Sequence, residues 1–228
     1  MRKRVLSFLF HHHLKFIIPI FHLLVSGNRL RLGKETIINF TSANVYKTVI
    51  DLKSGVQNNI FVGEGSDLHN SRITIKGNKN RVCIGENAFV NGLNLIIEGE
   101  GNVVDIGDGA FILDDTRMYV VDGSLLSIGN GCMFSDHIEI RTTDNHSILD
   151  MHTEERINYE KNVVFHDDVW IGTRTIILKG SEIAEGCIVG AGSLVTGKHA
   201  KPHCILAGNP AREIKENVSW RMERIRRA

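Results

Sequence analysis

The chain has almost no net charge and few aromatic residues. Its 27 Lys and Arg side chains nearly balance 26 Asp and Glu, which leaves a formal charge of +1 on 228 residues. This balance excludes a global field that would attract nucleic acid or a strongly acidic partner, and no nucleic-acid-binding motif is present. Aromatic residues make up 7%, and proline occurs 3 times against 22 glycines. The composition predicts tight corners and narrow packing around one substantial core.

Paired cysteines are missing as well. The four cysteines, Cys83, Cys132, Cys187 and Cys204, lie far apart, with no CxxC pair among them. Such thiols are typical of reduced, mostly buried small side chains in a reducing compartment. We therefore expect a cytoplasmic protein.

No hydrophobic run is long enough to span a bilayer. Residues 1–33 open with three basic side chains, and the uncharged run from Phe16 to Asn28 is short and contains Pro19. No small-residue cleavage site follows, as a signal peptide would require. Two interpretations stay open for this segment. It is either a cap over the first coil of the scaffold or a basic amphipathic segment resting on the inner membrane surface.

What the chain does contain is a short internal repeat, the feature that decides its architecture. An aliphatic residue followed by glycine recurs every 22 residues, and a small residue stands four positions after each aliphatic one. The aliphatic positions are Val62, Ile84, Ile106 and Ile128, and the small ones are Ser66, Ala88, Ala110 and Cys132. Nearer the C-terminus the aliphatic period tightens to six, in Ile171, Ile177, Ile183, Val189 and Val195.

A six-residue period fits neither an amphipathic helix nor an alternating strand alone. It predicts a solenoid that turns a corner after each short strand, with the aliphatic residue inside and Gly or Asn at corners that need positive φ. Stacked coils then pair strand on strand at about 4.8 Å. We predict an all-β fold, a triangular parallel β-helix over residues 34–210. A short helix over residues 211–228, with Trp220 as its anchor, is expected to follow Pro210.

The segments "VWIGTRTIILKGSEIAEGCIVGAGSLV" and "ILAGNPAREIK" resemble the hexapeptide-repeat acyltransferases. The similar branch is that of the sugar O-acetyltransferases, which includes galactoside, maltose, and capsule or lipopolysaccharide acetyltransferases. The resemblance covers roughly residues 62–215. It implies a left-handed β-helix, an exception to the right-handed crossover rule. It also implies a homotrimer with active sites between subunits, acetyl-CoA as co-substrate and no metal.

The repeat breaks once, over residues 141–162, and His146 lies inside the break. In the resembling enzymes a projecting loop places one histidine at the subunit groove, and His146 precedes Trp170 by 24 residues, a similar interval. A neutral imidazole accepts the proton of a sugar hydroxyl near pH 7. The resemblance therefore implies His146 as general base in a direct transfer without an acyl-enzyme. Outside this motif, a loop histidine that satisfies a turn is the commoner case.

Three neighbours of the motif are candidates for acceptor contacts. Asp144 and Asp150 either orient the imidazole, contact the acceptor, or are solvated loop carboxylates with neither role. Trp170 either walls the acetyl or acceptor pocket or is a large corner residue. We predict Asp144 and Trp170 as substrate-binding residues.

The acetyl donor is expected along the C-terminal coils, where the repeat is tightest and a smooth edge suits a pantetheine arm. The family pattern falls on Thr173, Ala191, Thr196, Lys198, Arg212 and Lys215. Gly197 displaces the usual basic residue by one position, to Lys198. Arg212 and Lys215 match phosphate contacts and have suitable cationic heads, or they are plain surface charges.

A metal site is the main alternative chemistry, because a β-helix carbonic anhydrase binds zinc through three histidines. His137, His146, His152 and His166 do not follow that spacing. His166 also occupies a slot where the pattern normally has glycine, which the sequence does not explain. We predict an acetyl-CoA-dependent O-acetyltransferase acting on a sugar hydroxyl of a bacterial capsule or O-antigen polysaccharide or its precursor. The alternatives are N-acetylation of an amino sugar and a non-catalytic, glycan-binding β-helix.

Overall fold

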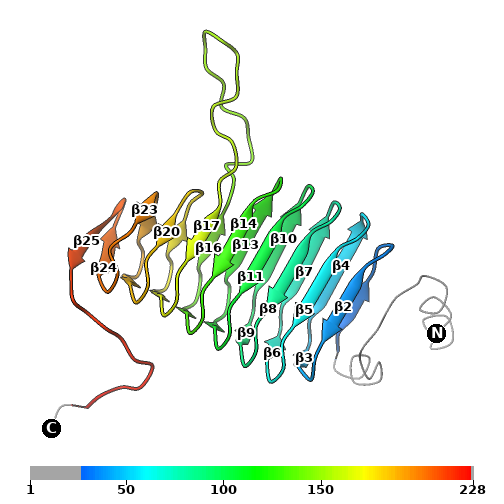
Figure 1. Cartoon of the computed structure of the whole chain (residues 1–228), viewed down its shortest axis with the longest axis horizontal. Coiled ribbons are helices and arrows are strands. Elements are labelled where there is room, and N and C mark those ends of the chain that lie inside the picture. The colour runs from blue at the N-terminus through cyan, green and yellow to red at the C-terminus, as the bar shows by residue number, and fades with distance from the viewer. Residues whose placement is uncertain (1–26, 227–228) are drawn as a thin grey trace.

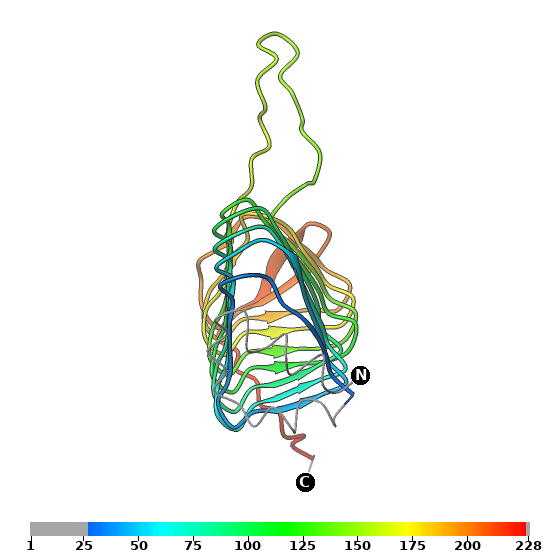
Figure 2. The same cartoon turned by 90° about the vertical axis from the view of Figure 1, so that its right-hand side faces the viewer.

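The computed structural model describes residues 27–226, and every regular element in that range is a β-strand. Each coil contributes one strand to each of three parallel sheets, which form the sides of a triangular prism (Figures 1 and 2). The fold is a left-handed parallel β-helix of about 8 turns, as predicted.

Sheet 1 contains β1 (Arg29–Arg31), β4 (Val49–Ser54), β7 (Arg72–Lys76), β10 (Asn94–Glu98), β13 (Arg117–Val121), β16 (Glu139–Arg141), β19 (Ile176–Ile177) and β22 (Leu194–Val195). Sheet 2 contains β2 (Ile37–Phe40), β5 (Asn59–Val62), β8 (Arg81–Ile84), β11 (Val103–Ile106), β14 (Leu125–Ile128), β17 (Val163–Phe165), β20 (Glu182–Ile183) and β23 (Lys198–His199). Sheet 3 contains β3 (Asn44–Tyr46), β6 (Asp67–His69), β9 (Phe89–Asn91), β12 (Phe111–Ile112), β15 (Met133–Phe134), β18 (Trp170–Ile171), β21 (Ile188–Val189), β24 (Ile205–Gly208) and β25 (Ala211–Lys215).

The core is a set of stacked aliphatic columns, one along each sheet. In sheet 2, Val62, Ile84, Ile106 and Ile128 are direct register partners, and none is more than 3% exposed. The small residues four positions later are buried at the next corner, as the repeat predicts. The inward side chains of each coil are therefore buried by one another, across its three strands, and by those of the two neighbouring coils.

A ladder of buried asparagines ties the coils together at the corner between sheets 1 and 2. Asn80 donates its backbone N–H to Asn58 Oδ1 (3.0 Å), and Asn102 donates to Asn80 Oδ1 (2.9 Å). Ser124 continues the ladder by donating its N–H to Asn102 Oδ1 (3.2 Å). All three amides are fully buried, and each side chain supplies the acceptor that the next coil needs.

A second set of hydrogen bonds runs along the outside of the corner between sheets 2 and 3. Asp167 Oδ1 accepts the N–H of Asn130 (2.7 Å), and the coils approach so closely that a Cβ added at Gly129 would lie 2.5 Å from this oxygen and 2.5 Å from the carbonyl carbon of His166. The His166 ring extends to Glu182 Oε1 (3.3 Å). Nothing in the structure explains why histidine replaces glycine at position 166.

Both ends differ from the sequence prediction. The β-helix begins with β1 at Arg29, inside the segment assigned to the cap, and residues 1–26 of that segment lie outside the described residues. The helix predicted over residues 211–228 is wrong for its described part. Residues 211–215 form β25, antiparallel to β24, and residues 216–226 are irregular. The open edge of β24 offers unpaired backbone groups that β25 satisfies, and this outweighs weak helical propensity. Within residues 27–226 no helix is long and apolar enough to cross a membrane.

Replacing the middle rung of the asparagine ladder should destabilise the protein. In Asn80→Ala, the backbone N–H and the side-chain amide of Asn102 lose their acceptor inside the core. We expect a loss of roughly 1–3 kcal/mol for each buried group left unpaired, measured by urea denaturation followed by circular dichroism. Glu86→Ala on the same coil is exposed and should change stability by no more than about 0.5 kcal/mol. Equal effects of the two substitutions would contradict the role of the ladder.

Candidate active site

The predicted break in the repeat is a long hairpin that projects from the corner between sheets 1 and 2 (Figure 1). Residues 142–162 form it, between β16 and β17. Ile157 donates its N–H to Ile148 O (2.9 Å), so the two arms pair near the middle. At the tip, Asp150 Oδ1 accepts the N–H groups of His152 (2.8 Å) and Thr153 (3.0 Å). Asp150 is therefore a turn-capping residue, and its suggested contact with the imidazole or an acceptor stays a prediction.

Both ends of the hairpin are fixed to the asparagine ladder. Thr142 is buried and its hydroxyl lies 2.8 Å from the Ser124 hydroxyl, the last rung. On the returning arm, Asn162 Oδ1 accepts the N–H of Leu125 (2.9 Å). The hairpin thus begins and ends at hydrogen bonds to Ser124 and Leu125, which form the platform below it.

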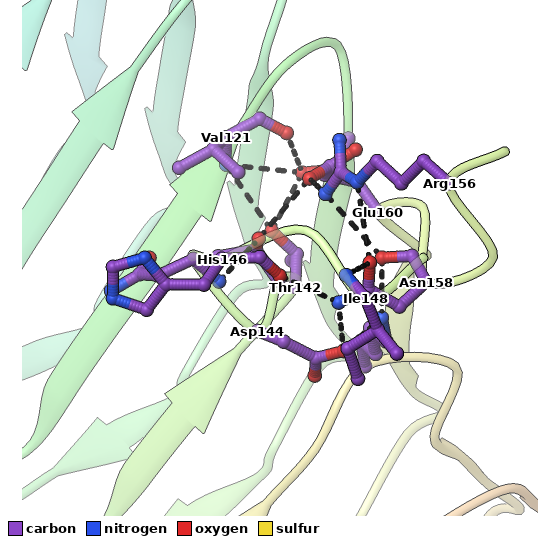
Figure 3. Close-up of polar contacts among 12 residues, drawn as sticks. Val121, Thr142, Asp144, His146, Ile148, Arg156, Asn158 and Glu160 are labelled. Atoms are coloured by element: carbon purple, nitrogen blue, oxygen red, sulfur yellow. Dashed lines mark hydrogen bonds and ion pairs between the residues drawn. The ribbon is translucent and has the colours of Figure 1, made fainter. Parts of the chain in front are cut away.

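Asn158 holds the two arms together above that platform (Figure 3). Its Oδ1 accepts the N–H of Ile148 (2.8 Å), and its Nδ2 donates to Asp144 Oδ2 (2.9 Å) and to His146 O (2.8 Å). Lys179, one coil further on, donates to Asp144 Oδ2 and to Asn158 O (2.8 Å). Sequence reasoning missed Asn158 and Lys179, because neither residue type nor spacing marks a loop amide or a surface lysine as a support.

The backbone of His146 is held on both sides, whereas its ring is presented to solvent. Its N–H donates to Asp144 O (2.8 Å) and its carbonyl accepts from Asn158. The side chain is exposed, and in Figure 3 the ring points away from the Asp144 carboxylate. Asp144 therefore does not orient the imidazole. The Lys179 ammonium, followed by the Asn158 amide, holds the pKa of Asp144 below its usual range, so this carboxylate stays ionised at neutral pH. Its contact with an acceptor stays a prediction.

Trp170 and Thr173 lie on and beside sheet 3. Trp170 is half-buried, and its Nε1 donates to Ser135 Oγ (3.4 Å). Thr173 stands at the corner between sheets 3 and 1. Its hydrogen bond to Asp136 lowers the pKa of that carboxyl, and the hydrogen bond of His137 to the same group lowers it less. Gly192 donates its N–H to Thr173 O (2.8 Å), which places Ala191 beside Thr173 on the next coil. The structure thus brings Trp170, Thr173 and Ala191 onto neighbouring positions.

The remaining donor candidates lie on the last coil and on β25. Thr196 is exposed in the turn between β22 and β23, at the same corner as the hairpin. Lys198 forms an ion pair with Glu182 (2.7 Å). Arg212 and Lys215 are exposed on β25. Burial is the main cause that lowers the pKa of His199, and the positive charge of Arg212 lowers it further.

A shallow hollow adjoins the Thr173 corner on the N-terminal side. Its lining residues are Asp115, Arg117, His137, Ile138 and Glu139. The His137 ring lies between Asp136 (2.7 Å) and Asp115 (3.5 Å). The four histidines weighed as a metal set are therefore not gathered, because His137 and His166 occupy different corners and His146 and His152 are on the hairpin. Residues 27–226 contain no group of three or more His, Cys, Asp or Glu that would hold a metal.

Within one chain the predicted site residues fall into two separate groups. His146 and Thr196 belong to the corner between sheets 1 and 2, where Lys179 also lies. Trp170 belongs to sheet 3, the side of the prism opposite that corner (Figure 2). A single copy of the chain therefore does not bring His146 to Trp170.

Residues 162–197 match the family model described as "Bacterial transferase hexapeptide (six repeats)". Residues 162–197 therefore carry the hexapeptide repeat of these transferases. Over 81 residues the chain is 36% identical to a polysialic acid O-acetyltransferase of Escherichia coli O1:K1 / APEC, an alignment that covers 36% of the chain but only 26% of that relative.

Two solved structures extend the similarity over most of the chain. The polysialic acid O-acetyltransferase OatWY superposes with a TM-score of 0.82 and 28% identity, covering 87% of this chain and 92% of that one. The polysialic-acid-specific acetyltransferase NeuO gives a TM-score of 0.63 and 27% identity, covering 77% and 83%. The likeness to both solved chains therefore reaches well beyond the matched hexapeptides.

Removing the Lys179 ammonium should loosen the hairpin. In Lys179→Met the Asp144 carboxylate and the Asn158 carbonyl lose a shared donor, so we expect amide exchange in residues 143–160 to accelerate roughly threefold to tenfold. Hydrogen–deuterium exchange by mass spectrometry measures this. Lys161→Met, at an exposed lysine of the same hairpin, is the matched control.

The same contact gives the wild-type hairpin an acid dependence. Because the folded pKa of Asp144 is lowered, its contribution is present above the carboxyl's unfolded pKa of about 4 and is lost as pH falls through the folded value. The exchange difference between wild type and Lys179→Met should therefore shrink in acid, where only the Lys179 contact with the Asn158 carbonyl is left. A difference of unchanged size in acid, or one of equal size in Lys161→Met, would contradict this role.

Proposed function

We propose that the chain is an acetyl-CoA-dependent O-acetyltransferase that acts on a hydroxyl of an acidic bacterial capsular polysaccharide. The observation that carries this proposal is the His146 ring, exposed on a hairpin whose base is fixed by Asn158 and Lys179. The similarity to two solved polysialic acid acetyltransferases supports the reaction class.

His146 acts in this proposal as the general base. Its neutral imidazole takes the proton of the sugar hydroxyl while the oxygen attacks the thioester carbonyl of acetyl-CoA. The tetrahedral intermediate collapses, the carbon–sulfur bond breaks, and the departing thiolate receives the proton from the imidazolium. Holding both substrates in one groove makes the attack effectively intramolecular. The fixed backbone of His146 leaves only side-chain rotations to the ring.

The active site is completed by a second copy of the chain, in a homotrimer. Since His146 and Trp170 lie on opposite sides of one prism, a groove that contains both requires the hairpin of one subunit and sheet 3 of the next. The hairpin also exposes large apolar side chains that a neighbouring copy would cover. They are Ile148 (53%), Leu149 (52%), Met151 (94%), Ile157 (61%) and Tyr159 (60%).

The acetyl donor is placed along the corner formed by Thr173 and Ala191 and on toward the last coils. Exposed cations at that end, Arg212 and Lys215, suit the phosphates of coenzyme A. An acidic acceptor is supported by the named substrate of the relatives. A cytoplasmic location, where acetyl-CoA is made, stays part of the proposal.

The activity is tested by release of free thiol from acetyl-CoA in the presence of polysialic acid, neutral polysaccharides and amino sugars. We expect thiol release with the acidic glycan, and a fall in kcat of about 10²–10⁴ in His146→Ala. His152→Ala removes another exposed histidine of the same hairpin and should keep full activity. Full activity in His146→Ala would overturn the mechanism. Thiol release with amino sugars alone would favour N-acetylation, and none with any acceptor would favour a glycan-binding protein.

Mixing two inactive variants tests the shared site. His146→Ala and Trp170→Ala should each be inactive as homotrimers. After co-refolding in equal amounts, about one quarter of the interfaces would pair an intact hairpin with an intact sheet 3, so about one quarter of wild-type activity should return. The single variants refolded alone are the controls. No recovery from a mixture that forms mixed trimers would place the site within one chain.

A further inference from the structure

The only two tryptophans of the chain lie against each other, although they are 50 positions apart. Trp170 belongs to β18 and Trp220 to the irregular tail after β25. Their ring centroids are 5.9 Å apart and the ring planes are inclined by 46°. Because Trp170 is the predicted wall of the acceptor or acetyl pocket, this contact brings the C-terminal tail to the proposed site.

Four contacts hold the tail in this position. Val218 donates its N–H to His203 O (3.0 Å) on the last coil, and Trp220 Nε1 donates to Asp168 O (2.6 Å) next to β18. The third is the contact between the two indoles. The fourth is an ion pair between Lys201 and Glu216. Between residues 212 and 226 only Val218 and Trp220 are even half-buried. The tail therefore runs from the last coil back to the coil of Trp170, and Trp220 is its attachment point.

The contacts constrain the Trp170 indole from two ends. Its Nε1 points to Ser135 Oγ, at the end of β15, whereas Trp220 is fixed to Asp168, just before β18. An indole on the outer face of a sheet has several accessible rotamers unless neighbours exclude them. Aromatic packing on one side and a hydrogen bond on the other leave one orientation.

We propose that Trp220 is a positioning residue that holds Trp170 as a wall of the acceptor site, so that the tail over residues 216–226 is part of the catalytic unit. This inference rests on the function proposed above. The packed indole offers its face to the apolar side of a sugar ring. Without Trp220, Trp170 keeps its place in β18 but loses its fixed orientation.

The full-length assembled protein allows a direct test, since Trp220→Ala and Trp220→Phe each leave Trp170 as the only fluorescent indole. We expect acrylamide to quench Trp170 about twice as strongly in Trp220→Ala as in Trp220→Phe, where an aromatic ring still covers it. Equal quenching in the two variants would overturn the proposal. This readout does not depend on any catalytic activity, so it separates failure of this inference from failure of the proposed function.

Steady-state kinetics with polysialic acid supply the second readout. Trp220→Ala should raise KM for the glycan at least fivefold, with kcat for the assembled protein changed less, and Trp220→Phe should restore most of the loss. Arg221→Ala, the exposed neighbour, is the control and should match wild type. Wild-type kinetics in Trp220→Ala, or no rescue by Trp220→Phe, would overturn the positioning role. Sedimentation and circular dichroism confirm that each variant is folded and assembled.

Discussion

The structure depends on the close stacking of one coil on the next. A single coil is too thin to remove its inward apolar side chains from water. Stability therefore comes from strand pairing between coils and from aliphatic columns that continue through the stack. The asparagine ladder adds a polar column inside this apolar core, in which Asn58, Asn80 and Asn102 satisfy one another across coils. A buried amide is tolerated only because its neighbours complete its hydrogen bonds.

This stacking also makes the projecting hairpin possible. The ladder ends at Ser124 and Thr142, the point where the chain leaves the prism, and Asn162 returns it to the same platform. Above that platform one amide, Asn158, ties both arms and fixes the backbone of His146. A long loop thereby fixes the backbone that carries one imidazole and leaves the ring itself in contact with solvent. That combination is what a base must have if it takes a proton from a large acceptor.

The triangular section then separates the parts of the site. A residue at one corner and a residue on the opposite side cannot meet in one copy, however favourable the chemistry of each. The hairpin at that corner exposes large apolar side chains, and sheet 3 carries Trp170 on the opposite side of the prism. At the C-terminal end, β25 closes the open edge of β24, and the tail continues from there to Trp170.

The amino-acid sequence alone determined the features that repeat. Val62, Ile84, Ile106 and Ile128 must be aliphatic because each faces the same narrow core, so the period, the β-helix and the position of the hairpin could be predicted, and with them His146 as a candidate. Only the tertiary structure decided the roles of Asp144, Asp150, Asn158 and Lys179, because these depend on which side chains meet across the hairpin and not on spacing. The same holds for the two ends: local propensity favoured a C-terminal helix, whereas the unpaired edge of β24, which exists only once the stack has formed, made that segment a strand. Sequence periodicity fixes what every coil shares, and contacts between coils fix what each one does differently.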